Sequence, residues 1–74
     1  MKIMKKEDKM RFMNVYQNLP LNERKNTIIV LEEPEINGKN KKEPISWDIA
    51  FIEIDQETKT GGIILNKLIK LNLI

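Results

Sequence analysis

The sequence has 74 residues, of which 41% are hydrophobic and 32% are charged, and its formal net charge is +2. A chain of this length forms one small domain that buries only about 60% of its unfolded surface, and its hydrophobic share excludes a disordered chain. It contains neither cysteine nor histidine, which excludes disulfides, thiolate or imidazole metal sites and the usual nucleophile–base pairs of enzymes. We therefore expect a single domain over residues 1–74, with no cofactor and no enzymatic activity.

The charges are unevenly distributed along the chain. Residues 1–26 carry seven Lys/Arg and three acidic residues, residues 27–57 carry three and eight, and residues 58–74 carry three and none. Such a basic, acidic, basic pattern can complement itself within one fold or between two copies. The basic side chains near the amino terminus form a candidate electrostatic surface, made of Lys5, Lys6, Lys9 and Arg11.

The charged segment over residues 1–6 is expected to be frayed, and a helix is predicted from about Glu7 to Asn18. Its apolar side chains recur at the spacing of one buried stripe, namely Phe12, Val15, Tyr16 and Leu19. Pro20 ends this helix, because the residue before a proline is pushed out of the α region. A turn follows, which can include one helical turn with Pro20 at its first position.

The segment TIIVLEE, residues 27–33, predicts the central strand, because three of its four consecutive apolar residues are β-branched. An unbroken apolar run indicates that both faces of the strand are covered. Residues 34–44 are predicted to be a flexible loop, with a tight-turn signal at Asn37-Gly38. The alternative for this region is a short hairpin, in which residues 35–36 pair with residues 41–45.

The stretch ISWDIAFIEI, residues 45–54, fits both the helical and the strand period. A helix is favoured, because Ser46 is a good N-cap and Asp48 lies in the first turn. Ile49 and Ile52 then fall on the side opposite the apolar stripe, where something else must cover them. The alternative is a bulged strand in a small sheet.

Residues 58–62, TKTGG, predict a turn in which Thr58 or Thr60 can cap the next helix. That second carboxyl-terminal helix is predicted within residues 61–74, although the last six residues also fit a terminal strand. Eight of the last twelve residues are aliphatic, more than a single core-facing stripe requires. If some of them stay uncovered, they form an apolar patch of the kind that marks a contact site.

The acidic residues Asp48, Glu53, Asp55 and Glu57 cluster in the sequence. A pair of carboxylates can act as acid and base or bind Mg²⁺. The simpler interpretation is that they form the solvated face of a helix, because charged side chains usually lie outside.

These elements together predict a small α+β domain with an amino-terminal helix, a central strand or short hairpin, and two carboxyl-terminal helices. The candidate protein interface consists of Ile49, Ile52, Leu65, Leu68 and Ile69. We expect a non-enzymatic interaction or regulatory module that forms a homo-oligomer, or binds a protein partner, through its aliphatic carboxyl-terminal segment. The alternative is a nucleic-acid-binding protein that uses the basic amino-terminal segment. Without a secretory signal or an apolar run of about 18 residues, a cytoplasmic location and no membrane partner are expected.

Overall fold

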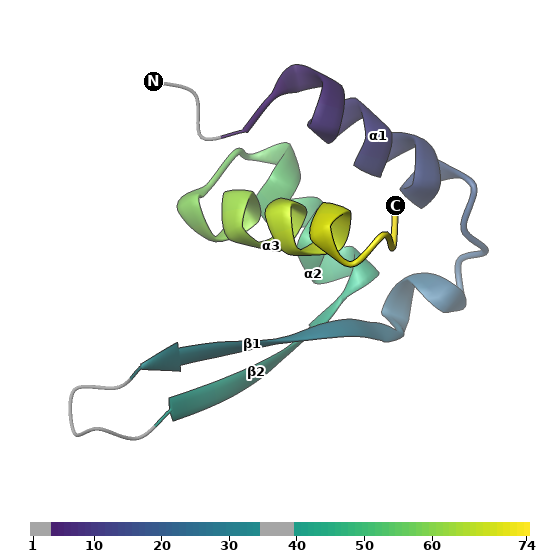
Figure 1. Cartoon of the computed structure of the whole chain (residues 1–74). Helices are drawn as coiled ribbons and strands as arrows, with labels where there is room; N and C mark the ends of the chain where they lie inside the picture. Colours follow the sequence, from purple (N-terminus) through teal and green to yellow (C-terminus); the bar gives the residue numbers. More distant parts are fainter. Residues whose placement is uncertain (1–3, 35–39) are drawn as a thin grey trace.

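The computed structural model describes residues 4–34 and 40–74. These residues form a small α+β domain, in which an antiparallel hairpin extends from a body of helices (Figure 1). The elements follow in the order α1 (Lys6–Gln17), the short 3₁₀ helix η1 (Glu23–Lys25), β1 (Thr27–Pro34), β2 (Asn40–Ser46), α2 (Trp47–Asp55) and α3 (Lys59–Lys70). The predicted fold class is confirmed, with a hairpin in the middle of the chain order.

Helix α1 begins at Lys6, one residue before the predicted start, and Glu7 and Asp8 occupy its first turn. Acidic residues there interact favourably with the positive end of the helix dipole. Met4 is buried just ahead of the helix, which differs from the frayed end expected for residues 1–6. Burial of this apolar side chain stabilises the entry into α1, and residues 1–3 lie outside the described part of the chain.

The hairpin pairs Ile29 with Ile45 and Glu33 with Lys41. The predicted loop over 34–44 is therefore shorter, because residues 40–44 belong to β2. The register also differs from the expected pairing of residues 35–36 with residues 41–45. Residues 35–39, which include the predicted turn, lie outside the described residues.

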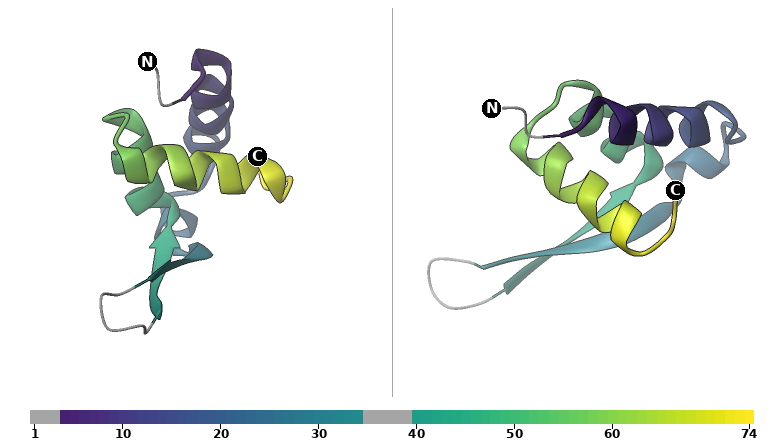
Figure 2. Two further views of the ribbon diagram at one scale, coloured as in Figure 1. Left: turned by 60° about the vertical axis from the view of Figure 1, so that its left-hand side comes forward. Right: turned by 45° about the horizontal axis from the view of Figure 1, so that its top comes forward.

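The two faces of β1 are not both covered along its whole length, contrary to the expectation from its unbroken apolar run. Ile29 and Leu31 are buried, whereas Val30 between them is 45% exposed. Successive side chains of a strand point to opposite faces, and the helices lie on one side of the hairpin (Figures 1 and 2). The second face of the hairpin is therefore exposed to solvent at Val30.

The stretch over residues 45–54 changes from strand to helix at Ser46. Ile45, the residue before the last of β2, is fully buried in the core, and the Ser46 hydroxyl accepts a hydrogen bond of 3.2 Å from the amide of Ile49. This is the predicted N-cap, which satisfies one of the amides left open at a helix start. The helical interpretation of Trp47–Asp55 is confirmed, and the alternative of a bulged strand through Ile54 is wrong.

Helices α2 and α3 meet at a tight turn. Glu57 has a positive φ of 54°, and the amide of Thr58 donates to the carbonyl of Glu53 at 3.1 Å, as in a Schellman C-cap. The Thr58 hydroxyl then accepts from the amide of Gly61 at 2.9 Å and caps α3. Helix α3 thus begins at Lys59. The predicted helix begins two residues later, at Gly61.

The core lies between the three α-helices and the base of the hairpin. Its fully buried large side chains are Phe12, Ile45, Ile54, Ile64 and Leu68. Beyond α3, Asn72 adopts a positive φ of 60°, and residues 71–74 do not form the alternative terminal strand. An Asn at this position tolerates the left-handed conformation that ends a helix.

Candidate interaction surfaces

The outer side of α2 exposes two isoleucines. Ile49 is 42% exposed and Ile52 is 54% exposed, and they lie three residues apart, on adjacent turns of one helix face. The buried residues Ala50 and Ile54 point the other way, into the core. The structure thus leaves uncovered the two isoleucines that do not fit the buried stripe. We call Ile49 and Ile52 the α2 ridge.

The carboxyl-terminal members of the predicted interface lie elsewhere. Leu65 and Leu68 are 2% and 0% exposed, and Ile69 packs against the core as a half-buried residue. The large hydrophobic side chains that α3 and the following residues do expose are Ile63, Leu71 and Leu73. The structure therefore does not bring the five predicted interface residues onto one exposed surface, because α3 uses its apolar stripe for the domain's own core.

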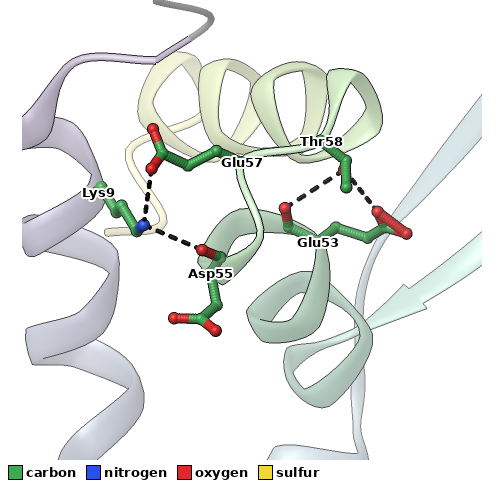
Figure 3. Close-up of polar contacts among 5 residues, drawn as sticks. All are labelled: Lys9, Glu53, Asp55, Glu57 and Thr58. Carbon is green, nitrogen blue, oxygen red and sulfur yellow. Dashed lines mark hydrogen bonds and ion pairs between the residues drawn. The ribbon is translucent and has the colours of Figure 1, made fainter.

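The predicted basic surface is divided in a similar way. Lys5, Lys6 and Arg11 are exposed, whereas Lys9 turns toward the carboxyl end of α2 (Figure 3). Its Nζ donates to the backbone carbonyl of Asp55 at 3.0 Å and to the Glu57 carboxylate at 3.2 Å. A cation at a helix carboxyl end is favourable because it faces the negative end of the dipole. The basic and acidic segments thus complement each other within one domain at Lys9.

Three of the four clustered acidic residues have separate partners. Asp48 accepts from Tyr16, Glu53 from Thr58, and Glu57 from Lys9. Among residues 4–34 and 40–74, no group of three or more acidic side chains is arranged to hold a metal ion. In the described part of the chain these carboxylates serve contacts between elements.

A polar cluster joins α1, η1 and α2 at Tyr16. Its hydroxyl donates to Asp48 at 2.6 Å, and the Arg24 guanidinium carbon lies 4.4 Å from the centroid of the Tyr16 ring, a distance typical of cation–π contacts. The hydrogen bond to Asp48 raises the pKa of Tyr16; burial and the Asp48 charge act in the same direction, and Arg24 opposes them. No sequence signal pairs Tyr16 with Asp48, because 32 positions separate them.

Aromatic rings connect this polar cluster to the core. Tyr16 stacks on Phe51 with centroids 4.4 Å apart, and Phe12 lies 6.0 Å from both Tyr16 and Trp47. Such pairs add stability beyond their buried area. Tyr16 and Trp47 are packed against the core, so neither ring stands free as an interface anchor.

A cavity of about 400 Å³ opens beside the first half of α1. Its described lining consists of Met4, Lys6, Lys9, Met10, Met13 and Glu57. Lys6 and Lys9 belong to the predicted basic surface, but no sequence signal indicates that Glu57, from the α2–α3 turn, joins them. The cavity is therefore a product of the way α1 packs against that turn.

The comparisons with known proteins identify no relative. No family model, curated protein or solved structure matches the chain. Within the described residues, no helix has the length and apolar character needed to cross a bilayer.

Proposed function

We propose that this chain is a small non-enzymatic interaction or regulatory module that self-associates through the α2 ridge. The observation that carries the proposal is the exposure of Ile49 and Ile52, at 42% and 54%, on adjacent turns of one helix. Paired aliphatic side chains on a helix face can pack against the same face of a second copy, as in a two-fold symmetric dimer. Removing them from water supplies the driving force.

Leu65 and Leu68 are not part of the proposed contact, because they are buried in the domain's core. The carboxyl-terminal segment contributes indirectly, because its packing under α2 leaves the ridge facing outward. The acidic residues Asp48 and Asp55 lie on the same helix. Asp55 is exposed and lies three residues from Ile52, so repulsion between the two copies of Asp55 weakens the association at low salt. Added salt screens this repulsion and strengthens the association.

The test is sedimentation of the full chain over a wide concentration range, for the native sequence and for the double variant Ile49→Ser/Ile52→Ser. The native chain should show concentration-dependent association, and the variant should weaken it by at least about tenfold, since it lacks the two isoleucines that the proposed contact buries. Leu21→Ser is the matched control, because Leu21 is 75% exposed and lies outside α2. A native chain that stays monomeric at every concentration, or a control that acts like the double variant, overturns the proposal.

A further inference from the structure

The cavity beside α1 has the character of a small-molecule site. Its volume of about 400 Å³ falls within the range of about 300–1,000 Å³ typical of ligand pockets. Met4, Met10 and Met13 give it an apolar lining, and methionine adapts its shape to irregular ligands. A few charged groups stand among these thioethers, as expected where polar contacts orient a largely apolar ligand.

The charged lining has a positive excess. It contains the ammonium groups of Lys6 and Lys9 and the carboxylate of Glu57. The Glu57 carboxylate is compensated by Lys9, at 3.2 Å. The Lys6 ammonium makes no hydrogen bond or ion pair with any residue that the structure describes. The described lining therefore carries one net positive charge, and the exposed ammonium of Lys6 is free to meet a ligand.

We propose that this cavity binds a small apolar carboxylate, with its hydrocarbon chain against the three methionines and its carboxylate at Lys6 and Lys9. This ligand class matches both properties of the lining, because it buries apolar surface and its charge is opposite to the net charge of the lining. A neutral hydrocarbon gains no attraction from the lysines, and an organic cation faces a lining with one net positive charge.

The ion pair between Lys9 and Glu57 lies in the lining of the cavity, so a substitution of Glu57 tests the proposed site. A bound carboxylate competes with Glu57 for the Lys9 Nζ, whose second acceptor, the Asp55 carbonyl at 3.0 Å, can stay in place (Figure 3). Glu57→Gln removes the competing charge and should tighten binding by about twofold to fivefold. Lys6→Gln should weaken binding by a similar factor.

The experiment titrates the full chain with decanoate, below its micelle concentration, and follows the methionine methyl signals by NMR. Decanol carries the same chain without the charge, and acetate carries the charge without the chain. Lys5→Gln is the matched control for Lys6→Gln, because Lys5 is an exposed neighbour that does not line the cavity. Met10→Gln removes apolar lining from a side chain that is already 55% exposed, so the fold is preserved.

Saturable binding of one decanoate per chain is expected, with decanol and acetate weaker, Lys6→Gln and Met10→Gln reduced, and Glu57→Gln improved. Equal binding of decanoate and decanol overturns the proposed charge recognition. An equal loss in Lys5→Gln and Lys6→Gln shows only general attraction to a basic helix and overturns the site. Absence of saturable shifts at the methionine methyls overturns the proposal as a whole.

Discussion

The hydroxyl of Tyr16 donates a hydrogen bond of 2.6 Å to the carboxylate of Asp48 and joins the last turn of α1 to the first turn of α2. Arg24 lies over the ring of the same tyrosine, and its Nε is buried with no hydrogen-bond partner among the described residues. Tyr16 therefore contacts both Asp48 of α2 and Arg24 of η1.

Tyr16→Phe should lower the free energy of unfolding by about 1 kcal/mol, because it removes one partly buried hydrogen bond to a carboxylate but keeps the stacked ring. Urea denaturation followed by the fluorescence of Trp47, the single tryptophan, measures the change. Tyr16→Leu, which also loses the stacking on Phe51, should cost more. Unchanged stability in Tyr16→Phe would show that the contact contributes nothing.

The raised pKa of Tyr16 predicts a loss of stability at high pH. Above the ordinary tyrosine pKa of about 10, the unfolded chain releases the phenol proton while the folded chain retains it. The unfolded state then binds fewer protons, so the free energy of unfolding falls as pH rises from 10 to the folded pKa. Denaturation curves across this window should show a smaller fall in Tyr16→Phe. Because Tyr16 is the single tyrosine, tyrosinate absorbance gives the folded pKa directly.

Gly61→Ala should destabilise the domain by about 2–3 kcal/mol, the upper range for added volume in a packed site. A Cβ on Gly61 would lie 2.3 Å from the carbonyl oxygen of Glu53, a backbone atom at the end of α2. The two helices must therefore separate. Gly62→Ala is the control, because it lies in the same helix and gains the same helix propensity. The melting temperature of Gly61→Ala should lie well below that of Gly62→Ala. Equal melting temperatures would contradict the close approach of the two helices.

Glu57→Gly should be more stable than Glu57→Gln by about 1 kcal/mol. Both variants lose the contact with Lys9, which is partly exposed and contributes about 1 kcal/mol or less. Only glycine relieves the cost of a side chain at φ 54°, about 1 kcal/mol or slightly more for a non-glycine residue. Chemical denaturation of the two variants measures the difference, and a glycine variant less stable than the glutamine variant would refute a cost at this φ.

The two N-caps should differ in strength. Ser46→Ala should cost about 1 kcal/mol, the typical value for a lost cap. Thr58→Ala should cost more, up to about 2 kcal/mol, because the Thr58 hydroxyl caps α3 and also donates to the Glu53 carboxylate at 2.6 Å. Thr58→Ser, which keeps the hydroxyl, should recover most of the loss. Equal costs for the two alanine variants would show that the Glu53 contact is unimportant.

The sequence by itself determined the local elements. Pro20 and Ser46 mark a helix end and a helix start by backbone restriction and capping, which depend on neighbouring residues alone, and both marks agree with the structure. The β-branched run beginning at Thr27 likewise predicted a strand that is present. Such signals act over a few residues, so they can be interpreted without knowledge of the fold.

Tertiary structure decided which faces are covered and which charges meet. Periodicity selected the aliphatic stripe of α3 but could not show that Leu65 and Leu68 lie inside the domain while Ile49 and Ile52 lie outside. Nor could it place Lys9 against Glu57, 48 residues away. Burial and ion pairing depend on how helices pack across long sequence separations, and that packing decides whether a basic or aliphatic residue forms a surface or fills the core.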